Sequence, residues 1–206
     1  MIGRDGYMIP KKIHYCWFGK GKKSKLALKC IRSWRQYCPE YEVIEWNEEN
    51  FDIDMNGYTR MCYAEKKYAY LSDYVRLWVV EKYGGIYFDT DVEVIRSLEE
   101  LLRNDAFFCF ENKQYVASGL GFGSVAHGKV IQAMLKEYEI LLDGKNGVRM
   151  CPKLNTQALV ALGLKQNGRK QNVCEAVIYP MDVLNPYNSA TGKLEKTENY
   201  IFHSLV

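Results

Sequence analysis

The stretch Tyr83–Asp91, which reads YGGIYFDTD, places two carboxylates directly after a short apolar segment. Ile86–Phe88 is predicted to be a strand, and the two glycines before it end the preceding helix. Ligands collect at the carboxyl ends of strands in open α/β sheets, and alternate residues of an extended chain face the same way. Asp89 and Asp91 are therefore predicted to face one ligand.

The acidic pair favours a bound cation. Two adjacent negative charges repel each other unless a cation lies beside them, and a divalent ion with oxygen ligands resolves this conflict. Phosphate oxygens can complete the shell of such an ion, which then neutralises charge on a departing diphosphate. Taken alone, the Asp-x-Asp pattern is a weak motif, because a polar turn after a strand has the same sequence.

The helix predicted over Ala64–Tyr83 places polar side chains among apolar ones. Asp73 and Arg76 are three residues apart and therefore lie on one helix face. Two interpretations follow from these residues. The pair is either an intrahelical ion pair at the surface or a carboxylate and a guanidinium that bind sugar hydroxyls in a cleft. The spacing favours neither.

The rest of the pattern predicts a single α/β domain, because strand, helix and strand alternate in the first 46 residues. Further strands are predicted at Ile13–Phe18, Glu42–Trp46, Val92–Ile95, Phe107–Phe110, Ala176–Tyr179 and Tyr200–Phe202. Further helices are predicted at Ser24–Tyr37, Leu98–Arg103, Val130–Leu142 and Thr156–Leu164. Loops are predicted at Asn47–Gly57 and, because it is rich in glycine, Gly119–Gly123.

Composition excludes several classes of protein. A net charge of +3 is too small to indicate a nucleic-acid partner. The seven cysteines are odd in number and lack a C-x-x-C spacing, which disfavours a zinc site and a disulfide framework and favours reduced thiols. No signal peptide or membrane-spanning stretch is apparent. We therefore expect a cytoplasmic protein whose only membrane contact is peripheral, at the inner face.

An aromatic residue and a run of lysines follow the first predicted strand. Trp17 ends that strand, where an indole stacks on a nucleobase or packs in the core. Lys20, Lys22, Lys23 and Lys25 suit contacts with phosphate or with anionic lipid head groups. A solvated charge run explains these lysines equally well.

Three stretches together resemble a known family. Ile9–Gly19 (IPKKIHYCWFG), Ala69–Leu77 (AYLSDYVRL) and Tyr83–Asp91 are similar to the opening strand, the helix signature and the metal-site strand of the glycosyltransferase family with a sugar-binding region containing a DXD motif. That family includes bacterial capsular-polysaccharide transferases and yeast outer-chain mannosyltransferases. The glucosyltransferase domains of clostridial toxins are more distantly similar. The resemblance covers roughly the first half of the chain.

The resemblance implies a fold and an activity. The fold is GT-A, a single Rossmann-like domain with a mostly parallel mixed sheet flanked by helices, in which residues 1–110 bind the nucleotide sugar and 111–206 face the acceptor. The implied enzyme uses Mn²⁺ or Mg²⁺ and a nucleotide-sugar donor, a UDP-sugar in preference to a GDP-sugar. It transfers the sugar with retention to a saccharide or lipid-linked acceptor in polysaccharide biosynthesis. A metal-dependent phosphoryl-transfer or hydrolase enzyme and a non-catalytic sugar-binding module are the alternatives.

The resemblance also implies roles for individual donor-binding residues. Trp17 is expected to stack on the nucleobase, and Ser72 to line the nucleotide pocket. Asp73 and Arg76 are expected to hold hydroxyls of the donor sugar. Tyr87 is expected to contact the diphosphate or the sugar.

The remaining implied roles concern catalysis and the metal. Asp91 is expected to bind the metal directly, and Asp89 to contact ribose and sugar and to reach the metal through water. Together with Arg76 they form the implied catalytic set. His203 matches a histidine that closes over the diphosphate in the family and is a further candidate metal ligand, although the chain stops at Val206 where the family usually continues. Two elements of the second half, the loop at 118–123 and the pair at 155–156, are expected to border the cleft.

Overall fold

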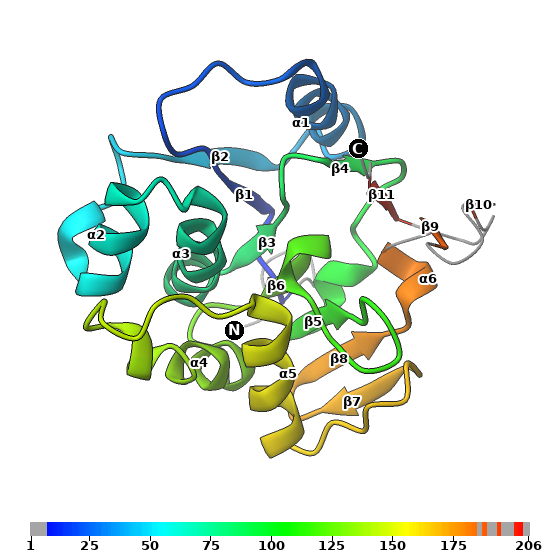
Figure 1. The fold of residues 1–206 in the computed structure, drawn as a ribbon. Helices are drawn as coiled ribbons and strands as arrows, with labels where there is room; N and C mark the ends of the chain where they lie inside the picture. Colours follow the sequence, from blue (N-terminus) through cyan, green and yellow to red (C-terminus); the bar gives the residue numbers. More distant parts are fainter. Residues whose placement is uncertain (1–7, 185–186, 189–192, 195–199, 204–206) are drawn as a thin grey trace.

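The computed structural model describes residues 8–184, 187–188, 193–194 and 200–203. A seven-stranded sheet with the order β2-β1-β3-β6-β5-β8-β7 forms its centre (Figure 1). The strands of this sheet are β1 (Lys12–Cys16), β2 (Glu42–Trp46), β3 (Gly85–Tyr87), β5 (Ala106–Cys109), β6 (Phe122–Ser124), β7 (Gln171–Val173) and β8 (Ala176–Tyr179). Two small antiparallel pairs are made by β4 (Val92–Val94) with β11 (Ile201–His203), and by β9 (Tyr187–Asn188) with β10 (Lys193–Leu194).

Helices flank the sheet. The α-helices are α1 (Lys25–Tyr37), α2 (Gly57–Ala64), α3 (Tyr68–Tyr83), α4 (Lys129–Lys136), α5 (Cys151–Ala161) and α6 (Met181–Leu184). Short 3-10 turns are η1 (Ile53–Met55), η2 (Leu101–Arg103), η3 (Ser118–Leu120) and η4 (Glu139–Leu141). None of the helices described is both long enough and apolar enough to cross a lipid bilayer.

The strand pairing confirms the predicted α/β class with a mixed sheet. β1 is parallel to both β2 and β3, and β5 is parallel to β8. Parallel pairing is less extensive than expected, because β6 is antiparallel to both of its neighbours and β7 is antiparallel to β8. The position of β6 matters for the site, because the start of β6 lies beside the carboxyl end of β3, with Phe122 opposite Tyr87.

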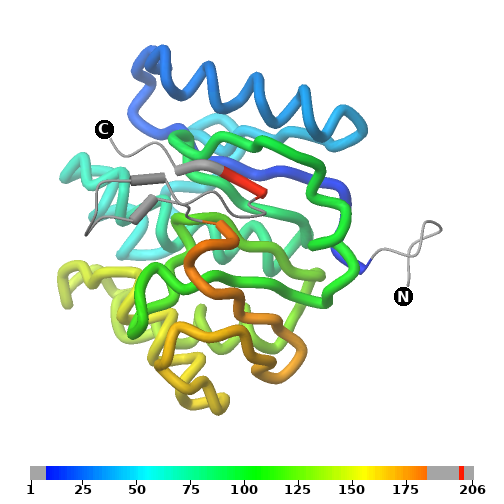
Figure 2. The backbone as a smooth tube through the Cα atoms, turned by 90° about the vertical axis from the view of Figure 1, so that its right-hand side faces the viewer, coloured from blue at the N-terminus to red at the C-terminus, as the bar shows by residue number. Residues whose placement is uncertain are grey.

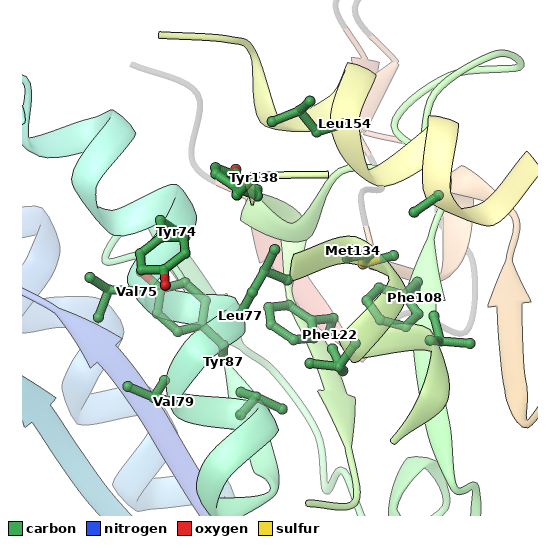
Figure 3. Close-up of a cluster of buried hydrophobic side chains, with 14 of the residues drawn as sticks. Tyr74, Val75, Leu77, Val79, Tyr87, Phe108, Phe122, Met134, Tyr138 and Leu154 are labelled. Atoms are coloured by element: carbon green, nitrogen blue, oxygen red, sulfur yellow. The ribbon is translucent and has the colours of Figure 1, made fainter. Parts of the chain in front are cut away.

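Each face of the sheet buries its own hydrophobic cluster. α2, α3, α4 and α5 cover one face, and α1, α6 and the β4–β11 pair cover the other (Figure 1). Successive strand residues alternate between the two clusters, so Ile86 and Phe88 pack towards α1 whereas Tyr87 packs towards α3. Figure 3 shows part of the α3 side, where helix residues meet Tyr87, Phe108 and Phe122.

The single helix predicted over Ala64–Tyr83 is wrong at its start. α2 begins at Gly57, inside the predicted loop, because the side chains of Asn56 and Thr59 form a reciprocal capping box. The chain then leaves the helix after α2, with Lys66 at a φ of 56°, and resumes as α3. The break gives α3 its own orientation across the sheet.

Other predicted boundaries also need correction. The helix predicted at 98–103 is only the 3-10 turn η2. The helix predicted at 130–142 ends at Lys136 and is followed by η4, and α5 begins five residues before the predicted start at Thr156. In contrast, the strand predictions at 42–46 and 176–179 are confirmed to the residue.

His14 fixes the β1 strand to its two neighbours. The indole N–H of Trp46 can only donate, so it donates to Nδ1 of His14 at 3.1 Å, and Nε2 of His14 donates to the carbonyl oxygen of Gly84 at 2.9 Å. The histidine is fully buried, and burial lowers its pKa from 6.5 to about 4. The neutral ring of His14, in β1, therefore forms hydrogen bonds with β2 on one side and with the turn before β3 on the other.

The buried histidine predicts a pH dependence of stability. Below pH 6.5 the unfolded chain protonates this residue while the folded chain does not, so stability is full above pH 6.5 and is lost as the pH falls towards 4. The loss is about 3 kcal/mol over this window. Urea unfolding between these pH values measures it, and His14→Gln should flatten the dependence. His127→Gln, at an exposed site, is the control; an equal flattening there would contradict the assignment to His14.

Candidate functional site

A pocket of about 340 Å³ opens at the carboxyl ends of β1 and β3. It brings together most of the residues singled out in the sequence. Its lining consists of Cys16, Trp17, Phe18, Tyr68, Ala69, Ser72, Arg76, Tyr87, Asp89, Thr90 and Asp91. The strand ends supply the aromatic and acidic residues, and one face of α3 supplies the rest, as the sheet-edge argument predicts.

Arg76 is the centre of a buried polar network in this pocket. Its side chain is only 4% exposed. Nη2 lies 2.8 Å from Oδ1 of Asp73 and 3.2 Å from Oδ1 of Asp89, and Nε donates to the carbonyl oxygen of Ser72 at 3.1 Å. The guanidinium lies over the ring of Tyr87, with 4.9 Å between its central carbon and the ring centroid. The network excludes the surface ion pair that the sequence alone left open.

The charged groups of this network shift one another's pKa values. Burial on its own would lower the pKa of Arg76, but Asp89 and Asp73 more than offset it, so the guanidinium stays charged. Burial raises the pKa of Asp89, and the neighbouring carboxylates Asp73 and Asp91 add to the rise, whereas Arg76 opposes it. The hydroxyl of Tyr87 also donates to Oδ1 of Asp89, at 3.1 Å. Asp89 is thus held by two donors.

One nitrogen of Arg76 has no partner among the residues that the structure describes. Nη1 is buried and makes no hydrogen bond to any described residue. A buried donor without a partner costs free energy, so this nitrogen is available for a ligand. Gly119 in η3 leaves room beside it: a Cβ there would lie 3.1 Å from Nη1 and 2.8 Å from Oδ2 of Asp89. Only glycine at this point keeps the space above the Arg76–Asp89 pair open.

Asp73 lies beside the pocket and contacts Arg76. It is not among the lining residues of the pocket, and its side chain, 14% exposed, pairs with Arg76. In the structure Asp73 positions the guanidinium. Direct contact between Asp73 and a sugar hydroxyl remains a prediction.

Trp17 lies at the pocket wall, where the sequence placed it. Its Nε1 donates to the carbonyl oxygen of Gly21 at 2.7 Å, and Nζ of Lys23 lies 5.5 Å from the ring centroid. The ring also borders a second pocket of about 380 Å³, which is lined by Trp17, Lys20, Gly21, Lys23, Glu45, Asn47, Glu48 and Glu49. The indole is therefore held in place at the junction of two hollows.

The acidic pair offers oxygen ligands for a hard cation. Asp89 and Asp91 both line the pocket. Among the described residues no group of three His, Cys, Asp or Glu side chains is placed to hold a metal. The backbone of His203 pairs with Val92, the residue after Asp91, while its side chain lies outside the described part of the chain. Two carboxylates suit Mg²⁺ or Mn²⁺ when a diphosphate and water complete the shell, so the donor set fits such an ion.

Five residues that line the main pocket are not among the site residues predicted from the sequence. Cys16 and Phe18 flank Trp17, Thr90 separates the two aspartates, and Tyr68 and Ala69 lie in the first turn of α3. A signal for Tyr68 was present, because residues 68, 72 and 76 are spaced by four and share a helix face. The other four carry no polar pattern that would single them out.

The start of α5 approaches the same network from the second half of the chain. Sγ of Cys151 lies 3.9 Å from Oγ of Ser118 in η3. Asn155, one turn further along α5, is fully buried, and neither of its side-chain polar atoms has a hydrogen-bond partner among the described residues. Thr156 accepts a hydrogen bond from the backbone N–H of Val116 and has a structural role. Neither Asn155 nor Thr156 is a lining residue of the main pocket.

The chain is similar in sequence to known glycosyltransferases. Residues 24–108 match the family model described as glycosyltransferase sugar-binding region containing DXD motif. Over 106 residues the chain is 32% identical to inositol phosphoceramide mannosyltransferase 3 of Schizosaccharomyces pombe (strain 972 / ATCC 24843), a match that covers 48% of this chain and 29% of that protein. The chain thus spans less than a third of the length of this relative.

Solved structures show the same architecture. The PaToxG glycosyltransferase superposes with a TM-score of 0.59 and 18% identity, over 74% of this chain and 69% of that one. The UDP-bound glycosyltransferase domain from the YGT toxin gives 0.50 and 13%, over 78% and 69%. At such identities a structural match establishes the fold alone. The chain has a GT-A fold and resembles, over residues 24–108, the glycosyltransferase sugar-binding region that contains the DXD motif.

Proposed function

We propose that the chain is a metal-dependent glycosyltransferase that takes a sugar from a nucleotide-diphosphate donor. The observation that carries the proposal is the buried guanidinium of Arg76 in a pocket shared with Trp17 and two aspartates. No described residue forms a hydrogen bond with its Nη1. A flat aromatic surface suits a base, a buried cationic donor suits sugar hydroxyls, and a carboxylate pair suits a cation on a diphosphate. The pocket offers all three together.

The donor is proposed to be a UDP-sugar in preference to a GDP-sugar. The UDP-bound toxin domain shares the fold and supports this choice. The acceptor is proposed to be a saccharide or a lipid-linked sugar in polysaccharide biosynthesis. A lipid-linked acceptor finds support in the matching mannosyltransferase, whose name specifies inositol phosphoceramide.

A divalent ion, when bound at Asp91 and Asp89, would neutralise the charge that develops on the leaving diphosphate. Arg76 orients the donor sugar through Nη1, and Tyr87 and Asp73 keep Arg76 and Asp89 in place. Retention is proposed to follow a front-face route, because Asp73 and Asp89 are both engaged by Arg76 and are poorly suited to act as nucleophiles. The anomer of the product, read by NMR, tests this route: an inverted linkage would exclude it.

Calorimetry with nucleotides tests the proposed function. UDP is expected to bind at least about tenfold more tightly with Mn²⁺ than with a chelator, and GDP more weakly than UDP. Metal-dependent binding distinguishes a transferase from a sugar-binding module, which needs no ion beside a diphosphate. Absence of any nucleotide binding, with the fold intact by circular dichroism, would overturn the proposal.

A further inference from the structure

Positive charge is concentrated in one short segment of the chain. Residues 20–37 contain seven of the 28 Lys and Arg residues and none of the 25 Asp and Glu residues. The rest of the chain therefore carries 21 basic and 25 acidic side chains, a net charge of −4. The small overall charge conceals a strongly basic segment on an otherwise acidic protein, which a whole-chain count cannot show.

The fold places this charge on the outer face of α1. Residues 27, 30, 31, 33 and 34 of the helix are buried, whereas Lys25, Leu28, Lys29, Arg32 and Arg35 are exposed at spacings of three and four. A single stripe along roughly 20 Å of helix thus faces solvent. Leu28, 44% exposed, lies in the middle of it.

Most of these charges are not neutralised by the protein. Lys23 pairs with Glu45, and Lys29 pairs with Glu93. The other basic residues of the segment form no ion pair with any described residue; they are Lys20, Lys22, Lys25, Arg32 and Arg35. Paired charges would explain the lysine run as a solvated surface. Five charges of one sign outside any ion pair, three on the exposed face of α1 and two in the loop before it, favour an anionic partner.

α1 lies along the outside of the molecule next to the candidate site. Figure 2 shows the helix running along one edge of the fold, with none of the described segments on its outward side. Trp34 donates to the carbonyl oxygen of Val92, and Oγ of Ser33 accepts from the N–H of Val94. The helix is therefore attached to the strand that directly follows Asp91, and the basic loop before it borders the hollow at Trp17.

We propose that this basic surface, formed by Lys25, Leu28, Arg32 and Arg35 of α1 and by Lys20 and Lys22 of the loop before it, binds the surface of an anionic phospholipid bilayer. A helix lying flat with a basic stripe and an exposed leucine has the chemistry of an interfacial element. A nucleic-acid partner fits less well, because the acidic remainder of the protein would repel a long polyanion. The proposal does not depend on the glycosyltransferase assignment, although it would bring the pocket close to a lipid-linked acceptor.

Vesicle cosedimentation of the full chain without nucleotide tests the proposal. The protein is expected to bind phosphatidylcholine vesicles with about 30% phosphatidylglycerol and not pure phosphatidylcholine, and to be released in about 0.5 M NaCl. Lys25→Gln with Arg32→Gln should weaken binding about thirtyfold. The matched control is Lys129→Gln with Lys136→Gln on α4, which removes two exposed charges at the same spacing of seven residues.

Three results would overturn the proposal. They are equal binding to neutral and anionic vesicles, an equal loss in the α4 control, and tight binding to a single-stranded oligonucleotide without binding to vesicles. All four substituted residues are exposed and form no ion pair with a described residue, so folding should persist, and a thermal melt verifies it. Because no donor is present, the outcome is independent of the calorimetric test of the proposed function.

Discussion

Arg76→Lys is expected to lower the rate of nucleotide-sugar hydrolysis or transfer by about a hundredfold to a thousandfold while leaving UDP binding within about threefold. A lysine keeps the positive charge between Asp73 and Asp89 but cannot contact both carboxylates and the carbonyl of Ser72 from one nitrogen. It also removes Nη1, the only donor of Arg76 without a partner among the described residues. The loss should therefore concern the sugar and not the nucleotide.

The uncharged variant has a different expected result. Arg76→Leu leaves two carboxylates in a buried site without their cation, and we expect about 3–5 kcal/mol lower stability in urea unfolding. Arg60 provides the matched control, because its ion pair with Asp54 is exposed and Arg60→Lys should change neither rate nor stability by more than about 1 kcal/mol. If Arg76→Lys weakens UDP and the UDP-sugar equally, Arg76 binds the nucleotide or supports the scaffold instead.

The sequence indicated the site residues but not how they contact one another. Spacing on a helix shows that Asp73 and Arg76 share a face, since it reports local geometry. It cannot show that Arg76 pairs with Asp89 as well as with Asp73, or that Gly119, in the second half of the chain, lies close to both Arg76 and Asp89. Those contacts depend on β6 lying antiparallel beside β3, a tertiary choice with no local signature.

Local signals likewise explain which elements were predicted. The strand at 42–46 alternates clearly and was found to the residue. The glycines at 119–123 predict a loop, yet Gly123 belongs in β6: a Cβ there would lie 2.5 Å from the ring of Phe107. α2 was missed because its capping residues, Asn56 and Thr59, resemble a polar loop. Gly123 is therefore a site of close packing within a strand, whereas the glycine content of the segment predicts a loop.

Asp91→Ala is expected to reduce turnover about a thousandfold and to make UDP binding independent of Mn²⁺, because a bound cation contributes several kcal/mol to leaving-group stabilisation. The charge of Asp91 is also one of the causes that raise the pKa of Asp89, so its removal relieves that repulsion.

Measuring both Mn²⁺-dependent UDP binding and the free energy of unfolding separates a metal-binding role of Asp91 from a structural one. Asp91→Asn, which keeps the shape of the side chain, should behave like Asp91→Ala in Mn²⁺-dependent UDP binding, and urea unfolding measures how far its stability changes. Asp54→Asn, at an exposed site, removes the same charge away from the pocket and should alter neither quantity. Turnover that survives with its metal dependence intact would refute the assignment of Asp91. A fall in stability large enough to explain the lost activity would place Asp91 in the scaffold instead.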